Sequence, residues 1–532
     1  MTRIKKTSTN LNSWYILCAL SLLTYLPFIF YFMWGNHDWQ WVKEYTPLLS
    51  GVFEGRFSQF ILPIALFEGK ILPVLTLLTA ITLYSLSAYI LLQMWQAPQK
   101  PLIVILLGLN IVIAPYTVSW LYFAFLILSC LSWPLFVILG FWLLQHHLKL
   151  NINIILAIIL FTLALGGYPP IINMIGTIFC TLALSDLCIK KLSVKSLIKK
   201  YLPYAISVII SVILLFFVQH LLKLHHLQYD TYNTAGITLQ ELAQKFLSDF
   251  PATFYQFVFT TSFIDESYKY ITLSLVLLSI WVMLKNLPKK LPNILAFIII
   301  IFGLLLSTIA TLIAAQNEIY VKYEPRIEFF TLPYIYTFAA VVLINSAEPI
   351  LKNVTFMALL FLAFHNFNNN TYAAKVWSLG FHAENNFSER FIKRLEDSGN
   401  FTPQNTQYTF VQGGTFSLRK RYYLPNSGTH EDSYTLTAPY IPWHLPYKAY
   451  TFYYPYAFVK QDFDIYWRYI YPSEIPLSQE LEQYLLQKSA PWPQNNAIFI
   501  SPSLIVLTLT YEGRGLAQSW YNQHFKLYPH EQ

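Results

Sequence analysis

Long apolar stretches alternate with short polar segments in the part of this chain before residue 368. A helix needs about 20 mainly apolar residues to cross about 30 Å of hydrocarbon, and stretches close to that length recur here. We therefore predict an α-helical polytopic membrane protein with about 11 transmembrane helices. Residues 60–67 form a shorter apolar run, for which we expect an interfacial or re-entrant segment. The expected spans cover residues 14–34, 71–93, 102–117, 120–144, 152–167, 170–188, 203–222, 271–286, 291–314, 330–346 and 352–367.

The pattern changes after the Asn-rich tract at residues 366–370. Residues 368–532 are rich in Tyr, contain Pro, and have no apolar run long enough to span a membrane. Apolar positions at residues 372–395 have helical spacing. Four short β-like runs follow, separated by Pro, Gly and Asn; they cover residues 407–412, 434–437, 448–458 and 497–507. We expect a membrane domain over residues 1–367 and a compact C-terminal α+β domain over 368–532.

Composition supports the membrane class. The chain of 532 residues is 55% hydrophobic and 12% charged, whereas soluble domains contain about 25% charged residues. Its mean hydropathy is +0.44. Cysteines lie in or at the end of apolar runs, so neither a disulfide framework nor a zinc or catalytic Cys is indicated; they are Cys18, Cys130, Cys180 and Cys188.

The net charge of +8 would suggest nucleic acid in a soluble protein, but here the basic residues cluster in alternate loops. Such loops face the cytoplasm, which places the N-terminus inside and, with an odd number of spans, residues 368–532 outside. No nucleic-acid partner is expected. Asp186 and Glu348 are the acids in these inside loops. The basic residues are Arg3, Lys5, Lys6, Lys100, Lys149, Lys190, Lys191, Lys195, Lys199, Lys200, Lys285, Lys289, Lys290 and Lys352.

Candidate chemistry gathers in the outer loops at residues 35–70, 223–270 and 315–329. Asp38 follows the first span directly, between aromatic residues, and Arg56 comes shortly after it in the same loop. A carboxylate can accept a proton and a guanidinium can bind phosphate oxygens at two points. The loop therefore suits chemistry on a substrate that is held in the bilayer.

Each of these residues also has a structural interpretation. Asp38 could cap an interfacial helix that begins after it, and the Trp residues near it could form an interfacial aromatic belt. Arg56 could pair with Glu54 or extend its charged end out of the lipid. Arg326 lies between Glu324 and Glu328, so an ion-paired loop is as good an interpretation as a phosphate contact.

Several motifs resemble the bacterial Gtr-type glucosyltransferases that modify O-antigen, which belong to the GT-C class of polytopic glycosyltransferases. The acidic residue Asp38 after the first span and the Gly-x-Phe-x-Gly-Arg-Phe stretch at residues 51–57 carry this resemblance. Residues 66–75, with the sequence Leu-Phe-Glu-Gly-Lys-Ile-Leu-Pro-Val-Leu, add to it. Tyr168, at the outer end of a span, and the Pro325-Arg326 pair before a late span complete it.

The resemblance implies transfer of a sugar, most simply glucose, from a polyprenyl-phosphate carrier to a cell-surface glycan. The reaction would take place on the periplasmic face of the bacterial inner membrane, with inversion at the anomeric carbon. A sugar phosphate already has a good leaving group, so a base and cations suffice. Asp38 would be the base, and Arg56 and Arg326 would bind the donor phosphate, with Lys70 and Lys322 as weaker candidates.

Aromatic and polar residues near these groups would contact the sugar or the acceptor: Trp39, Trp41, Glu54 and Tyr168. No cofactor is required and no metal ligand set is expected, although a divalent cation is possible. The pair His225-His226 with Asp230 invites a metal interpretation, but adjacent His residues on a helix point in different directions. Membrane lipid and a small flippase for the donor are further expected partners.

A second class of function stays open at this point, namely a flippase, an exporter or a polymerase component for lipid-linked glycan. Transporters usually keep charged residues in the middle of their spans. Here the expected spans are almost free of charge, and the ionisable residues gather outside them. This distribution favours a glycosyltransferase over a transporter.

Overall fold

The computed structural model describes most of the apolar part of the chain and a smaller share of the C-terminal part. Among the described residues, contacts divide the chain into one compact unit up to Ala374 and a second unit from Lys375 onward. The described residues are 11–30, 51–52, 55–70, 72–121, 126–146, 150–227, 247, 251, 266–308, 330–402, 408–413, 468–469, 478–484, 488, 490, 492 and 494–508.

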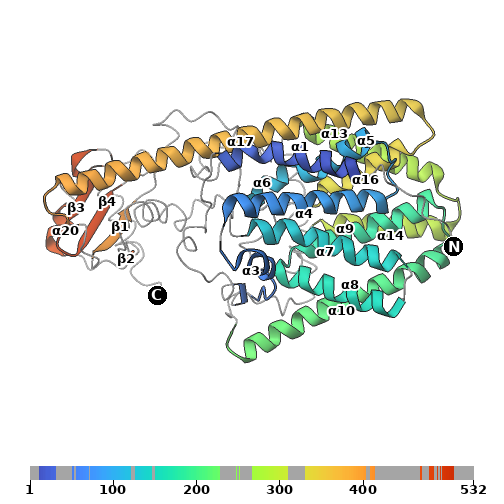
Figure 1. Ribbon diagram of the computed structural model, residues 1–532, viewed down its shortest axis with the longest axis horizontal. Coiled ribbons are helices and arrows are strands. Elements are labelled where there is room, and N and C mark those ends of the chain that lie inside the picture. Colours follow the sequence, from blue (N-terminus) through green and yellow to red (C-terminus); the bar gives the residue numbers. More distant parts are fainter. Residues whose placement is uncertain are drawn as a thin grey trace. The chain divides into compact units, whose positions relative to one another are not determined.

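The first unit is built from helices, many of which lie side by side, as α4, α7 and α8 do (Figure 1). Within the described residues the helices are α1 (Leu11–Phe30), α3 (Ile61–Phe67), α4 (Pro73–Met94), α5 (Pro101–Val112), α6 (Pro115–Leu121), α7 (Ile127–Gln145), α8 (Leu150–Gly167), α9 (Ile171–Leu184), α10 (Val194–Leu224), α13 (Glu266–Asn286), α14 (Leu291–Ser307), α16 (Leu332–Ile344) and α17 (Pro349–Asp397).

Within the described residues, 7 helices are long and apolar enough to cross a membrane, judged by length and composition. One of them, Ile171–Ile189, consists of α9 and a π-helical turn at Ser185–Ile189. Four shorter apolar helices, α5, α8, α14 and α16, coincide with other expected spans. The predicted class of polytopic helical membrane protein is therefore confirmed, whereas the count of eleven spans stays a prediction. The short helix α3 occupies the run at residues 60–67 for which an interfacial or re-entrant segment was expected.

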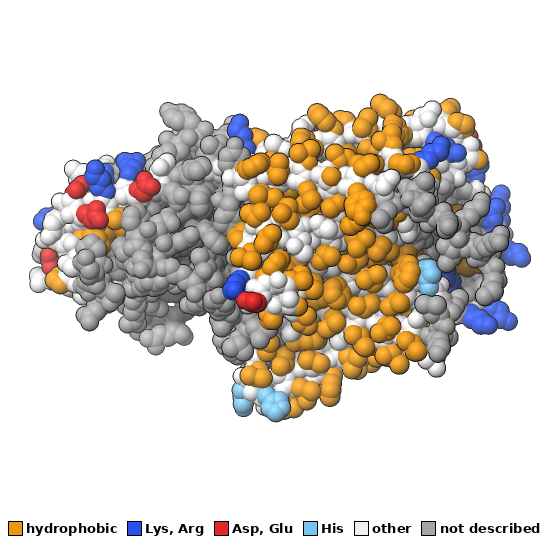
Figure 2. All heavy atoms as spheres, viewed as in Figure 1, with side chains coloured by type: hydrophobic (Ala, Val, Ile, Leu, Met, Phe, Trp, Pro, Cys, Tyr) orange, Lys and Arg blue, Asp and Glu red, His pale blue; other side chains and the backbone are white. Residues whose placement is uncertain are grey.

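Many large apolar side chains are exposed on the described helices of the first unit, unlike on the surface of a soluble protein. Figure 2 shows hydrophobic side chains over a broad area of this unit. On α10, for example, Ile209, Ile213 and Phe217 are each more than half exposed. Exposed apolar area of this extent marks a surface that another apolar phase covers, which for a polytopic helical protein is lipid.

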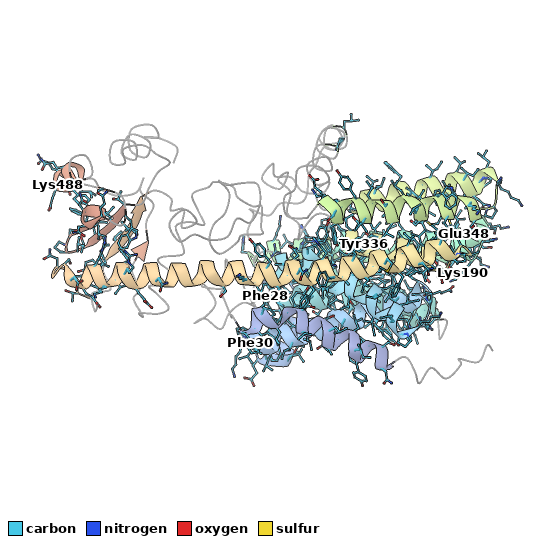
Figure 3. All side chains as sticks on the ribbon, turned by 90° about the horizontal axis from the view of Figure 1, so that it is seen from above. Phe28, Phe30, Lys190, Tyr336, Glu348 and Lys488 are labelled. Atoms are coloured by element: carbon cyan, nitrogen blue, oxygen red, sulfur yellow. The ribbon has the colours of Figure 1, made fainter. Side chains whose placement is uncertain are left out.

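The loops that we expect on the cytoplasmic side meet at one end of the first unit. Lys285 Nζ lies 3.2 Å from Glu348 Oε1, and Asn345 donates to the Gln96 carbonyl at 3.2 Å. The buried Asp186 pairs with Lys190 at 2.7 Å and also with Lys200. Figure 3 shows Lys190 and Glu348 toward one end of this unit and Phe28 and Phe30 toward the other. Which side of the membrane each end faces stays a prediction.

The helix formed by residues 101–121 is interrupted. Helix α5 ends at Val112, and Pro115 begins α6, so carbonyl groups near the break lack the usual helical donors. Side chains from other helices donate to them instead. Tyr25 donates to Val112 O at 2.8 Å, Tyr336 to Asn110 O at 2.8 Å, and Asn370 to Ile113 O at 2.9 Å. An unpaired backbone group in lipid costs several kcal/mol. That cost is a large fraction of the roughly 5–15 kcal/mol by which native proteins are stable.

The second unit contains a small mixed sheet. Strand β1 (Thr409–Gly413) pairs in parallel with β2 (Arg468–Tyr469) and with β4 (Leu504–Thr508), and β3 (Ile498–Ile500) pairs antiparallel with β4. A short helix, α20, covers Gln479–Gln483.

The sheet and the last turns of α17 share one apolar core. Its buried members include Phe391, Leu395, Tyr408, Trp492 and Ile505. Apolar residues on one face of the helix thus cover one side of the sheet, which is the usual way for a small sheet to bury its hydrophobic face.

Two of the β-like runs contain described strands, namely 407–412 with β1 and 497–507 with β3 and β4. The runs at 434–437 and 448–458 lie outside the described residues. The structure differs from expectation at the Asn-rich tract, which was expected to separate a span from a later helix. It lies inside the single helix α17, and Asn366 and Asn370 are fully buried there.

Candidate functional site

The Gly-x-Phe-x-Gly-Arg-Phe stretch forms a tight turn that fixes Arg56. The Gly55 amide donates to Val52 O at 2.9 Å, and the Arg56 amide donates to Gly51 O at 2.7 Å. Gly55 has φ +75°, a conformation that glycine adopts without strain. A Cβ at Gly51 would lie only 2.8 Å from the Phe60 ring. Both glycines are therefore needed for this turn.

The residues after Arg56 dock on the C-terminal end of α8. Ser58 donates its hydroxyl to Leu163 O at 2.6 Å and its amide to Gly166 O at 3.2 Å. The bond to Gly166 satisfies a carbonyl that the end of a helix leaves without a helical donor. A Cβ at Gly166 would overlap the Phe57 ring, so the close approach of the turn to α8 depends on that glycine.

Arg56 lies over the ring of Tyr168. Its Cζ is 5.7 Å from the ring centroid, within the range of a cation–π contact. Tyr168 directly follows α8, whose C-terminal end carries partial negative charge. The half-buried guanidinium is thus stabilised by an aromatic ring and by the end of a helix.

Tyr168, Trp120 and Phe330 come from three segments of the chain and form a cluster of rings, the aromatic wall. The Trp120 ring, from α6, lies 4.9 Å from the Tyr168 ring and 5.5 Å from the Phe330 ring, measured between centroids. All three side chains are buried. Such rings can pack against the apolar face of a sugar or against a lipid chain.

The turn is held from α7 and α10 as well. Ser129 Oγ donates to the carbonyl of Gln59, and Gln219 Nε2 donates to Gly55 O at 3.3 Å. On α7, Trp133 lies one turn after Ser129 and packs against Gly167, where a Cβ would overlap its indole. The position of Arg56 is therefore determined by contacts with α7, α8 and α10.

Lys70, the weaker candidate for phosphate binding, is in an exposed ion pair. Its Nζ lies 2.7 Å from Glu68 Oε2. The hydrogen bond from Lys70 holds the pKa of the Glu68 carboxyl below its usual value. Exposed pairs of this kind contribute little to stability, so Lys70 can exchange this partner for another anion at low cost.

Of the other expected site residues, six lie outside the described residues, namely Asp38, Trp39, Trp41, Glu54, Lys322 and Arg326. Their geometry stays a prediction. Within the described ranges, no group of three or more His, Cys, Asp or Glu residues could hold a metal ion.

Several residues of this site were not among the expected ones. The pair Gly166-Gly167 beside Tyr168 has a recognisable signal, because two glycines end an otherwise apolar helix. Ser58 and Gln59 are polar residues directly after the Gly-Arg-Phe motif, which is a weaker signal. Trp120 has no such sequence signal, because a Trp within an apolar run usually belongs to the hydrophobic core.

The arrangement combines a positioned guanidinium with an aromatic wall at one end of the first unit's helices. A guanidinium can bind a phosphate at two points, and aromatic rings can pack against a sugar ring or a lipid chain. The described part of the site provides binding groups, and a general base would have to come from another segment.

A model of the family described as Glucosyl transferase GtrII matches residues 45–344 of this chain, more than half of its 532 residues. The matched region contains Arg56, Tyr168, Trp120 and Trp133. No curated protein and no solved structure matches the chain.

Proposed function

Because this chain belongs to the Glucosyl transferase GtrII family, we propose that it moves glucose from a polyprenyl-phosphate carrier to a cell-surface glycan such as O-antigen. Family membership confirms the resemblance to Gtr-type glucosyltransferases and supports glycosyltransferase activity. The apolar helices make it a membrane protein. The lipid-phosphate donor, the O-antigen acceptor and the periplasmic site are our proposal.

One observation carries this proposal: Arg56 is held over Tyr168 by a glycine-dependent turn inside the matched region. A donor made of sugar, phosphate and a long lipid presents a charged group at the membrane boundary with apolar parts beside it. A fixed guanidinium next to aromatic rings matches that combination. Arg326 would supply a second positive charge, and Lys70 and Lys322 would be auxiliary.

The proposed reaction is a displacement at the anomeric carbon. The acceptor hydroxyl oxygen attacks C1 of the donor sugar while the bond from C1 to the phosphate oxygen breaks, and the electron pair of that bond leaves with the phosphate. Asp38 takes the proton from the acceptor hydroxyl. Arg56 and Arg326 stabilise the negative charge that grows on the departing phosphate, and a single displacement inverts the configuration.

The proposed location follows from the charge of the loops. The N-terminus and the lysine-rich loops would face the cytoplasm, and Asp38, Arg56 and residues 368–532 would face the periplasm. Because polyprenyl-phosphate sugars are made on the cytoplasmic side in this scheme, a separate small flippase would deliver the donor. The C-terminal region would position the acceptor glycan.

The test is the structure of the surface glycan in cells that carry the intact gene, no gene, Arg56→Gln, or Asp38→Asn. Each variant is first checked for normal abundance in the membrane. We expect the intact gene to add one sugar that the other three strains lack, with chain length and export unchanged. If the intact gene changed only the amount or length of the polysaccharide, the protein would instead be an exporter or polymerase component.

A further inference from the structure

Two buried N–H donors near the candidate site have no hydrogen-bond acceptor within the described residues. They are Nε2 of Gln59 and Nε1 of Trp133. Gln59 is 2% exposed and Trp133 is fully buried. Trp95 provides a contrast, since it is equally buried and its Nε1 donates to Thr181 Oγ1 at 3.2 Å. A buried donor without an acceptor destabilises a protein, so its presence calls for an explanation.

The two donors belong to the same part of the molecule. Ser129 Oγ binds the Gln59 carbonyl, and Trp133 follows Ser129 by one turn of α7. The indole of Trp133, its Nε1 included, occupies the space where a Cβ of Gly167 would lie. Gly167 precedes Tyr168, whose ring carries Arg56. Both donors are thus built into the segments that hold the Arg56–Tyr168 pair.

We propose that Gln59 and Trp133 recognise a hydroxyl group of the hexose that is transferred. This inference rests on the proposed function and adds to it the group that selects the sugar. Neutral N–H donors in an apolar setting suit a neutral hydroxyl oxygen, whereas the charged phosphate belongs with Arg56. The aromatic wall of Tyr168 and Trp120 would pack against the carbon face of the same ring.

The inference predicts a particular kind of selectivity. A site that hydrogen-bonds a substrate hydroxyl rejects the analogue that lacks it, because its own buried donors are then left without partners. Purified protein in lipid nanodiscs is therefore assayed with polyprenyl-phosphate glucose and with the four monodeoxy donors. A second set of assays, the acceptor arm, combines polyprenyl-phosphate glucose with acceptors whose terminal sugar is a monodeoxy form. The variants are Gln59→Leu, Trp133→Phe and the control Trp95→Phe, with thermal stability measured for each.

We expect the wild type to use one of the deoxy donors about 10-fold less well than glucose. Gln59→Leu and Trp133→Phe should use glucose about 10-fold less well and should no longer discriminate against that deoxy donor. Trp95→Phe should keep the discrimination even if its stability falls. Selectivity lost only in the acceptor arm would overturn the inference, because Gln59 and Trp133 would then recognise the acceptor and not the hexose that is transferred.

Two further results would overturn the inference in different ways. The first is that the wild type transfers glucose and both variants discriminate among all deoxy compounds as the wild type does. The N–H groups of Gln59 and Trp133 then have a structural role, for example toward a buried water, and only this inference fails. If the wild type transfers no hexose from the lipid phosphate, the proposed function fails and takes this inference with it. Since Gln59→Leu changes little volume, it decides the question if Trp133→Phe does not fold.

Discussion

Arg56 and Tyr168 are far apart in the sequence, yet the Arg56 Cζ lies 5.7 Å from the centroid of the Tyr168 ring. The contact joins the turn at residues 51–60 to the end of α8 and gives the guanidinium a fixed place beside the aromatic wall. A guanidinium that is held in one place can bind a phosphate at two points.

Replacing Arg56 should therefore reduce transfer more than it reduces stability. We expect Arg56→Gln to lower the transfer rate about 100-fold, because phosphate departure loses a charged partner. Arg56→Lys should lose about 10-fold, since it keeps the charge but not the two-point geometry. Single-turnover transfer with polyprenyl-phosphate glucose measures both. Equal losses in the two variants would contradict a role for the guanidinium fork.

Alanine at Gly166 or Gly167 should displace the turn. The new Cβ would overlap Phe57 in the first variant and Trp133 in the second, and crowding of this kind costs about 1–3 kcal/mol. Thermal unfolding followed by fluorescence-detected size exclusion measures the loss. Gly303→Ala is the matched control, because its nearest neighbour, Cys180 Sγ, is 3.4 Å from the Cβ position. Unfolding temperatures equal to the control would contradict the packing described here.

The hydroxyl of Tyr336 should matter for stability. It donates to Asn110 O at 2.8 Å and lies 2.7 Å from the Tyr268 hydroxyl, so Tyr336→Phe removes both of these buried hydrogen bonds. We expect a loss of about 1–3 kcal/mol in unfolding free energy. Tyr270→Phe, at a position that is 63% exposed, should change stability by less than about 0.5 kcal/mol.

Asp38→Asn tests the proposed base. An amide cannot accept the acceptor proton, and loss of general-base catalysis typically costs about 100- to 10,000-fold. The variant should still bind donor, so a donor-protection assay, such as slower proteolysis in its presence, should give the same half-saturation as wild type. Full transfer activity in Asp38→Asn would contradict the mechanism and leave the family assignment intact.

Chelation tests the proposal that the arginines alone supply the positive charge. Since Arg56 and Arg326 would stabilise the leaving phosphate, we expect EDTA to change the transfer rate by less than about twofold. Transfer is measured with and without EDTA, and then with added Mg²⁺ or Mn²⁺. Complete loss that Mg²⁺ restores would show that a bound cation takes part in phosphate departure.

Hydrophobicity alone predicted the class of this protein, because span length follows directly from the thickness of the bilayer. It predicted less about how spans break and continue. Residues 102–117 and 120–144 were expected to be two spans, whereas a proline break divides the first of these regions into α5 and α6. The Asn-rich tract was expected to end a helix, but Asn370 finds an acceptor at the α5 break and the helix continues.

At the site, local motifs predicted Arg56 and Tyr168 as separate candidates. Their contact could not be predicted, because it depends on the packing of the turn against α7 and α8. The two buried donors were equally hidden, since burial of Gln59 and Trp133 is a property of the packed helices. The roles of Asp38 and Arg326 rest on the family resemblance and on chemistry, and they stay predictions.

The break between α5 and α6 also has a consequence for biogenesis. Two of the side chains that complete its carbonyls, those of Tyr336 and Asn370, follow their acceptors by 226 and 257 residues. Most of the first unit must therefore be synthesised before the carbonyl groups at this break receive their donors. In a nascent chain that stops before α16, the carbonyls of Asn110 and Ile113 lack these two donors. Completion of the break therefore depends on α16 and α17, the helices of the first unit that are synthesised last.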